Sequence, residues 1–251
     1  MALIVNADDF GKSMEINKAI TECFNRGYIN RTTIMVNMPY AVEAFEMAEK
    51  NGFTDKVGIH LNLTEGTPIT TGISKNPYFC DEEGKYNQVF CHSKKLRLHM
   101  DEESIFDIEK EIEAQYRIYT DLGFRLCHLD SHHHVHTNWP VFKALRNLSN
   151  TYKFSSIRLS RNLYRGGNKL NKIYKAVYNN QVKKICGETT DYFGSYTDCF
   201  EYFLNEDTFD DQRFKLFCLA NDVEVMVHPG YDENNKLIDI GVGPMNKLLT
   251  L

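Results

Sequence analysis

The stretch that decides the fold reads Leu3-Ile4-Val5-Asn6-Ala7-Asp8-Asp9-Phe10-Gly11. Residues 2–7 are short and apolar and predict a buried strand, which the two carboxylates that follow bring to an end. Apolar residues then recur at helical spacing, and Gly27 is a typical residue to end such a helix. A strand, a loop and a helix in this order form the first unit of an α/β fold.

The same unit recurs along the chain. Residues 32–38 predict a second strand, residues 41–52 a second helix and residues 57–63 a third strand. This order of elements predicts parallel strands with helices packed outside them. Later strands are predicted at 125–129, 156–159 and 223–227, and later helices at 101–122, 139–148 and 209–219.

Two long stretches lack this periodicity. Residues 64–100 gather glycines and prolines, and residues 161–205 are also predicted to be irregular. We therefore expect one domain over residues 1–251, with irregular insertions near 64–100 and 161–205. Loops of this length often form lids or binding segments.

The composition of the chain excludes several classes of protein. With 251 residues, 42% of them hydrophobic and 25% charged, the chain is typical of a globular protein rather than a disordered or fibrous one. The net charge of −5 disfavours nucleic-acid binding, and no apolar run approaches the ~20 residues of a membrane span. The seven cysteines include no C-x-x-C pair and the first ten residues lack a basic secretion signal, so we expect a cytoplasmic protein with reduced thiols.

Polar residues follow several of the predicted strands at the point where each strand ends. They are the pair Asp8 and Asp9, His60, the segment Asp130–His136, and His228. Because the carboxyl ends of parallel strands meet at one face of the fold, these residues can lie close together. The sequence therefore predicts one functional site at this face.

Asp8 and Asp9 are adjacent carboxylates, whose charges repel each other unless a cation lies beside them. A metal ligand next to a general base would explain the pair. The alternative is that one of the two caps the helix that follows, which is a common role of Asp before a helix.

Histidines are concentrated in the segment His128-Leu129-Asp130-Ser131-His132-His133-His134-Val135-His136, which holds five of the nine in the chain. If the segment is extended, His132, His134 and His136 face the same way. Neutral imidazoles bind metals, and a carboxylate such as Asp130 can orient them. The alternative is a solvated histidine-rich loop.

Four further polar residues are candidates for the same site. His60 and Asn62 share one side of a predicted strand, although a buried histidine bonded to the backbone is the alternative for His60. His228 precedes Pro229 and Gly230, which gives it the rigid mount that a general acid or base needs; the alternative is a simple turn residue. Arg158 could hold Asp8 or a substrate anion, or form an ordinary surface ion pair.

Together these features resemble the YdjC-like carbohydrate deacetylases, the family of chitooligosaccharide deacetylase. The matching segments, in family order, are residues 3–11, Thr32-Thr33 with Val36-Asn37, Gly58-Ile59-His60, residues 128–136 and Val225-Met226-Val227-His228-Pro229. The first and fourth segments are long and specific. The resemblance implies a distorted βα barrel of the polysaccharide-deacetylase type, and a homodimer.

The resemblance also implies roles for individual residues. Asp9, His60 and His132 would be the metal ligands, Asp8 the general base and His228 the general acid. The ion implied by the resemblance is Mg²⁺, whereas two imidazoles and one carboxylate favour Zn²⁺ or another transition metal by their softness. Residues expected to orient these groups or to contact substrate are Asp130, His134, His136, Arg158 and Asn62.

The predicted function is a metal-dependent hydrolysis that removes the N-acetyl group of a small amino sugar in oligosaccharide degradation. A chitooligosaccharide, with or without a phosphate, is the expected substrate by resemblance. Trp139, Tyr86 or Phe90 could stack on the sugar. The alternatives are a metal-dependent phosphoesterase and a non-catalytic protein that binds a metal or a carbohydrate.

Overall fold

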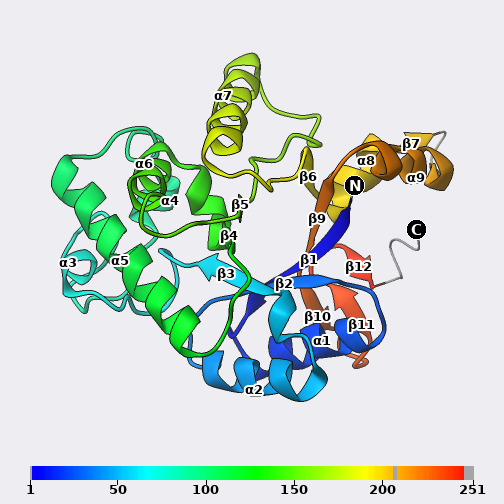
Figure 1. The fold of residues 1–251 in the computed structure, drawn as a ribbon, viewed down its shortest axis with the longest axis horizontal. Helices are drawn as coiled ribbons and strands as arrows, with labels where there is room; N and C mark the ends of the chain where they lie inside the picture. The colour runs from blue at the N-terminus through cyan, green and yellow to red at the C-terminus, as the bar shows by residue number, and fades with distance from the viewer. Residues whose placement is uncertain (1, 206–207, 246–251) are drawn as a thin grey trace.

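A seven-stranded sheet at the centre of the protein confirms the α/β fold (Figure 1). In the computed structural model, which describes residues 2–205 and 208–245, its strands are parallel and follow the order β5-β4-β3-β2-β1-β9-β6. The strands are β1 (Leu3–Phe10), β2 (Arg31–Ile34), β3 (Val57–Leu61), β4 (His128–Ser131), β5 (Ser156–Ile157), β6 (Tyr192–Ser195) and β9 (Val223–Val227). Several strands are shorter than predicted, because sequence patterns do not fix where a strand turns into a loop.

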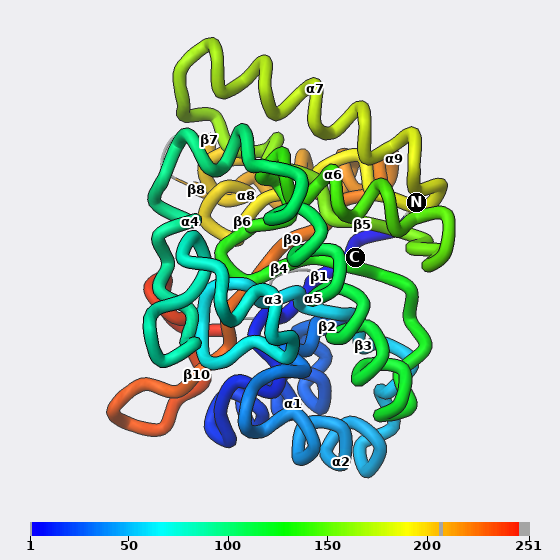
Figure 2. The backbone as a smooth tube through the Cα atoms, turned by 90° about the vertical axis from the view of Figure 1, so that its left-hand side faces the viewer, coloured from blue at the N-terminus to red at the C-terminus, as the bar shows by residue number. Residues whose placement is uncertain are grey.

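Helices connect the strands and cover the sheet. Helix α1 (Met14–Asn25) begins at Ser13, whose side chain accepts a hydrogen bond from the Ile16 N–H, and α2 (Ala41–Asn51) ends at Gly52 in the left-handed conformation. The other long helices are α5 (Glu102–Asp121), α6 (Trp139–Leu148), α7 (Lys169–Ile185), α8 (Tyr196–Tyr202) and α9 (Asp211–Ala220). Figure 2 shows α1 and α2 on one side of the sheet and α7 on the opposite side.

The sheet curls until its two edges approach each other. The Glu188 N–H donates to Ser155 O at 3.1 Å and the Asn162 N–H donates to Phe193 O at 3.0 Å, which links the segments around β5 to those around β6. In the described residues β5 and β6 nevertheless form no strand ladder with each other. The result is the distorted βα barrel that the family resemblance implies, with its seam between β5 and β6.

The interior of this barrel is polar, because side chains alternate across each strand. In β1, Val5 and Ala7 pack in the apolar core, whereas Asn6 and Asp8 turn inward and bond to each other. Other polar residues buried with them are Thr33, His60, Asp130, Arg158 and Glu224. The fold thus gathers ionisable groups from five different strands or strand ends.

The two insertions differ from each other. Residues 64–100 are irregular apart from two one-turn helices, α3 (Thr71–Ser74) and α4 (Val89–His92). The prediction of an irregular stretch at 161–205 is wrong, because this stretch forms α7, β6, α8 and β7 (Leu204–Asn205). Within α7 only Tyr178, Asn179 and Val182 are buried, so its apolar stripe is too short to stand out in the sequence.

Short elements complete the fold. They are η1 (Thr54–Lys56), η2 (His132–Thr137), β8 (Thr208–Phe209), which pairs with β7, and an antiparallel sheet of β10 (Pro229–Tyr231), β11 (Leu237–Asp239) and β12 (Gly243–Pro244). Tyr231 Oη donates to Glu22 Oε2 at 2.7 Å and ties this sheet to α1. None of the helices in the described part of the chain has the length and apolar character that a membrane crossing needs.

Candidate metal centre

The end of β1 presents two adjacent carboxylates to the same region. Asp9 has a φ of +72°, a left-handed conformation that is uncommon for Asp, and the pairing of β1 with β2 shifts register between Ala7 and Phe10. This irregularity allows Asp8 and Asp9 to contact one cluster of side chains although neighbouring residues of a regular strand point apart. The helix-capping interpretation of the pair is wrong, since Ser13 caps α1.

Asp9, His60 and His132 converge from the ends of β1, β3 and β4. Asp9 Oδ1 lies 2.8 Å from His132 Nδ1 and 3.3 Å from His60 Nε2. The three groups offer ligand atoms that all lie within 4.8 Å of one another. Two ligand atoms at about 2.1 Å from one ion, at right angles, are roughly 3 Å apart. The spacing and the chemistry of the donors therefore fit a divalent cation.

A second observation supports this fit. Asp9 Oδ1 is buried and accepts no hydrogen bond from the described residues, although one ring nitrogen of His60 and one of His132 lie near it. A buried carboxylate oxygen without a partner is costly. A cation between Asp9, His60 and His132 would satisfy this atom.

The outer nitrogen of each histidine is held by a carboxylate. His60 Nδ1 lies 2.7 Å from Asp130 Oδ1, and His132 Nε2 lies 2.9 Å from Glu65 Oε2. Carboxylates in this position fix the ring and the tautomer of metal-binding histidines. Glu65 is itself held by Lys12, whose Nζ lies 2.8 Å from Glu65 Oε2. The inner nitrogens of both rings are thus left to face Asp9.

The charges of the cluster depend on one another. Burial alone would raise the pKa of the Asp9 carboxyl, but its contacts with His132 and His60 hold that pKa well below its usual range. Burial alone would lower the pKa of His60, but Asp130 and Asp9 raise it to about 10. In the metal-free protein Asp9 is therefore ionised and His60 carries a proton at neutral pH.

Asp8 is paired with Arg158 in the barrel interior. Arg158 is only 1% exposed, and its Nη1 and Nη2 donate to the two oxygens of Asp8, each at 2.7 Å. Its Nε donates to Glu224 Oε1 at 2.6 Å, and its Nη2 lies 2.7 Å from Asp130 Oδ2. Arg158 therefore holds Asp8, which is one of the roles predicted for it, and the alternative of an ordinary surface ion pair is wrong because the side chain is buried.

Contacts with the Arg158 guanidinium distinguish among the three groups of residues that could hold a metal ion. The groups Asp8-His60-Asp130 and His128-Asp130-Glu224 both contain carboxylates that already pair with Arg158. Burial would raise the pKa of Asp8, but the charge and hydrogen bonds of Arg158 hold it well below its usual range. The group of Asp9, His60 and His132 is the one without a contact to this cation in the described residues.

The histidine-rich segment is not extended, so the prediction that His132, His134 and His136 face the same way is wrong. His133 and His134 have φ values of +51° and +54°, which turn the chain sharply within η2. His133 Nδ1 lies 3.0 Å from Thr64 Oγ1, whereas His136 is fully buried with its Nδ1 2.5 Å from Ser131 Oγ. His136 therefore stabilises the turn.

Asn62 and His228 lie at the ends of β3 and β9. Asn62 is fully buried; its Oδ1 accepts from the N–H groups of Thr64 and Glu65, and its Nδ2 donates to Glu65 O. It thus shapes the turn that brings Glu65 to His132. His228 is partly exposed, its N–H donates to Asp239 Oδ1 at 2.7 Å, and its charge lowers the pKa of Asp8.

A cavity of about 210 Å³ adjoins the cluster and is lined by both His133 and His134. The His133 ring lies 4.0 Å from the His132 ring, and Nδ1 of His134 is buried without a partner among the described residues. The aromatic side chains that line the cavity are Phe193 and Tyr174. The stacking role expected for Tyr86 or Phe90 is wrong, because both are buried and Tyr86 bonds to Glu111.

Several residues of the cluster were not predicted. Glu65 and Lys12 lie in loops and carry no local pattern, so only the structure reveals them. Glu224 and Thr33 contact Arg158 and Asp130 in the barrel interior. For Glu224 a signal existed, because it is a single carboxylate between Val223 and Val225 in an apolar strand.

Comparisons with known proteins identify relatives of this chain. Residues 2–247 match the family model described as YdjC-like protein. Three proteins named carbohydrate deacetylase are similar: one from Thermoanaerobacter pseudethanolicus (37% identity, 60% of this chain, 57% of the relative), one from Halalkalibacterium halodurans (38%, 61% and 61%) and one from Clostridium beijerinckii (30%, 92% and 82%). The matches to the first two relatives span less than two thirds of their length.

A solved structure is similar as well. It is a protein from Enterococcus faecalis V583, described as a candidate cellobiose-phosphate cleavage protein, with a TM-score of 0.65 and 25% sequence identity. The match covers 92% of this chain and 82% of that one. The barrel described above is therefore an arrangement that a solved protein also adopts.

Proposed function

The chain belongs to the YdjC-like family, and we propose that it is a metal-dependent hydrolase that removes an acetyl group from an N-acetylated sugar. The observation that carries this proposal is the arrangement of Asp9, His60 and His132, with the outer nitrogens of both histidines on carboxylates. The relatives named carbohydrate deacetylase supply the substrate class.

A divalent cation at Asp9, His60 and His132 would supply Lewis acidity, which polarises the acetyl carbonyl and makes water a better nucleophile. Asp8 is the proposed general base. It belongs to the same cluster, since an oxygen of its carboxylate lies within 4.8 Å of a His60 ring nitrogen. Arg158 keeps this carboxylate ionised and fixes its direction.

His228 is the proposed general acid. In the reaction the hydroxyl of water bonds to the acetyl carbon, the C–N bond breaks, and acetate and a free amine are formed. The amine is a poor leaving group unless it receives a proton, which the His228 imidazolium would donate. Asp239 Oδ1 accepts a hydrogen bond from the His228 N–H at 2.7 Å, which fixes the backbone that carries this ring.

We also propose a substrate, an ion, an oligomeric state and a cellular location. The substrate proposed is a small N-acetylated oligosaccharide, such as a chitooligosaccharide with or without a phosphate. The ion proposed is Mg²⁺, with Zn²⁺ as the alternative that the imidazole donors favour. We propose a homodimer in the cytoplasm, which light scattering on the purified protein and fractionation of cells would test. A two-metal phosphoesterase is less well supported, because Arg158 fills the neighbouring acidic group.

The test is acetate release from N,N′-diacetylchitobiose and from its 6-phosphate, using metal-free protein to which single ions are restored. Acetate release with one ion and not without it is expected. The Asp8→Asn variant should bind the ion as before but release acetate about 10²–10⁴-fold more slowly. Asp55→Asn, at an exposed position in η1, is the matched control. Phosphate release without acetate release from any N-acetyl sugar would contradict the proposal.

A further inference from the structure

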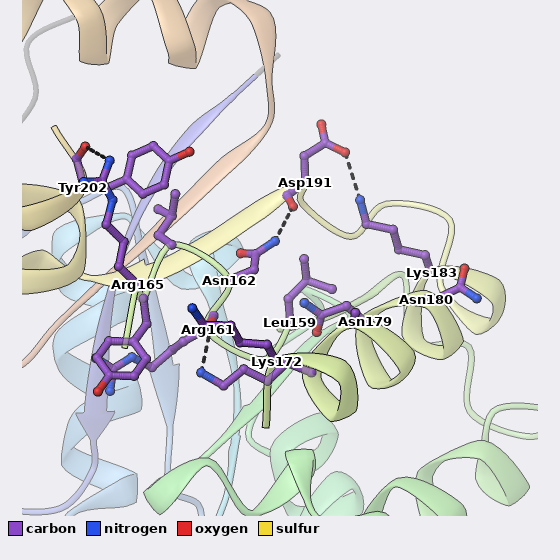
Figure 3. A pocket seen from close by; sticks show the side chains of 14 residues that line it. Leu159, Arg161, Asn162, Arg165, Lys172, Asn179, Asn180, Lys183, Asp191 and Tyr202 are labelled. Carbon is purple, nitrogen blue, oxygen red and sulfur yellow. Dashed lines mark hydrogen bonds and ion pairs between the residues drawn. The ribbon is translucent and has the colours of Figure 1, made fainter. Parts of the chain in front are cut away.

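A second cavity lies beneath α7, beyond the cavity that adjoins the cluster. It has a volume of about 510 Å³, and Figure 3 shows that its lining comes from α7, the segment after β5 and residues near β6 and α8. Leu159, Arg161 and Lys175 line both cavities. The two cavities together form a groove that starts at His133 and His134 and continues under α7, and we call it the α7 groove.

The α7 groove is strongly basic although the whole chain carries a net charge of −5. Its distal cavity is lined by one carboxylate, Asp191, whose Oδ1 already pairs with Lys183 at 3.0 Å. The cationic side chains that line it are Arg161, Arg165, Lys172, Lys175 and Lys183. A concave surface with this excess of positive charge attracts anionic ligands.

Two of these cations are held in place before any ligand binds. Asp198 accepts hydrogen bonds from Nε and Nη2 of Arg161, both at 2.6 Å, so Nη1 remains without a hydrogen bond to the described residues. Lys175 Nζ donates to Arg161 O at 3.1 Å. Burial and the charge of Arg161 lower the pKa of Lys175 more than the charge of Asp198 raises it, so the cations outweigh the one carboxylate that pairs with Arg161.

Two aromatic rings of the groove, those of Tyr164 and Tyr202, already lie beside cations. Arg161 lies over the Tyr164 ring at 5.0 Å, and Arg165 lies over the Tyr202 ring at 4.7 Å. A ring face that a cation occupies is not available for a neutral sugar to stack on. Lys172 is exposed and has no ion-pair partner among the described residues, so its charge is available to a ligand.

We propose that the α7 groove is a subsite for the anionic groups of an acidic oligosaccharide. The reacting N-acetyl sugar would lie at Asp9, His60 and His132, and acidic sugar units further along the chain would lie near Arg161, Lys175 and Lys172. This inference rests on the proposed function for the position of the reacting sugar. The chemistry recognised is a carboxylate or a phosphate, which Arg and Lys bind through charge-assisted hydrogen bonds.

The first test measures by calorimetry how tightly three probes bind to the metal-free 251-residue protein, which is not expected to release acetate. The probes are a tetrasaccharide of alternating N-acetylglucosamine and glucuronate, the neutral tetrasaccharide of N-acetylglucosamine, and inorganic pyrophosphate. We expect the acidic tetrasaccharide to bind about tenfold more tightly than the neutral one, as for one additional charge-assisted contact. Raising the salt concentration should remove this difference. Equal affinities at low salt would overturn the inference.

Pyrophosphate distinguishes a substrate subsite from a separate anion site. If the groove holds part of the substrate, pyrophosphate should compete with the acidic tetrasaccharide. Pyrophosphate and the tetrasaccharide binding simultaneously would overturn the inference in favour of a free phosphorylated ligand.

Substitutions of single lysines test whether the preference for the acidic tetrasaccharide arises in the α7 groove. Lys172→Gln and Lys175→Gln should each lower the preference for the acidic over the neutral tetrasaccharide by several fold, because each removes one cation from the groove. Lys184→Gln, at an exposed position of α7 outside the groove, should leave this preference unchanged. An equal loss in Lys184→Gln would overturn the inference. These binding measurements do not depend on acetate release. A failure of the proposed hydrolysis can therefore be distinguished from a failure of the proposed subsite.

Discussion

Arg158 donates two hydrogen bonds to Asp8, from Nη1 to Oδ2 and from Nη2 to Oδ1, each at 2.7 Å. The two residues are 150 positions apart in the chain and meet inside the barrel. The same guanidinium contacts Asp130 and Glu224, so one buried cation compensates three buried carboxylates. The candidate base and the carboxylate that orients His60 are therefore held by a single side chain.

Replacing Arg158 should destabilise the whole fold. Arg158→Met leaves Asp8, Asp130 and Glu224 buried without their cation, and removing one partner of a buried ion pair costs about 3–5 kcal/mol. Urea denaturation of the metal-free protein measures this change in the free energy of unfolding. Arg146→Met, at an exposed position of α6, is the control and should change it little. Equal stability of the two variants would show that the network contributes nothing.

The stability of the protein should fall steeply in acid. Burial raises the pKa of Asp8, but Arg158 lowers it by more, so this pKa lies below its usual range. Burial also raises the pKa of Asp9, but contacts with His132 and His60 lower it by more. A carboxyl group with a depressed pKa in the folded state stabilises the fold above its unfolded pKa of about 4, and this stabilisation is lost as pH falls further. Thermal unfolding followed from pH 7 to pH 3 measures the effect; an unfolding temperature that is constant below pH 4 is the opposing result.

Metal binding should release a proton. In the metal-free protein the pKa of His60 is raised to about 10, since Asp130 and Asp9 outweigh the effect of burial, so the ring is protonated at neutral pH. A histidine must lose its proton before it can bind a metal, and metal affinity should therefore rise as pH increases toward 10. Titration of an ion into weakly buffered protein with a pH indicator should show about one proton released per ion from this group. Binding with no proton release at pH 7 would mean that His60 is not a ligand.

Glu65 should act on the metal through His132. Its Oε2 lies 2.9 Å from His132 Nε2, and loss of such a carboxylate typically lowers metal affinity about 10–100-fold. Metal titrations of Glu65→Gln measure this change directly, and Glu46→Gln, at an exposed position of α2, is the matched control. If both variants bind the ion as the parent protein does, the contact of Glu65 with His132 has no role in the site.

The parts of the fold that the sequence predicts are those whose pattern is local. The apolar runs of β1 and β9 and the helical spacing of α5 identify their elements directly. The polar residues at the strand ends are visible for the same reason, because parallel strands bring their carboxyl ends together. These two rules were enough to place Asp9, His60 and His132 in one region.

Other parts depend on contacts between distant residues. The left-handed turns at His133 and His134 involve no glycine, so the sequence gives no sign that the histidine segment bends. α7 is mostly exposed and polar, which hides its helical period. The burial of Arg158 follows only from the pairing of β5 with β4 and from the position of Glu224 in β9, neither of which a local pattern can specify.

The most direct measurement is an anomalous difference map from crystals grown with Mn²⁺, which scatters anomalously and accepts the same oxygen and nitrogen ligands. The expected result is one peak about 2.0–2.3 Å from Asp9 Oδ1, His60 Nε2 and His132 Nδ1. Two results would contradict a metal site built from these three residues. One is a peak between Asp8 and Asp130, with Arg158 displaced, and the other is the absence of any peak near His60.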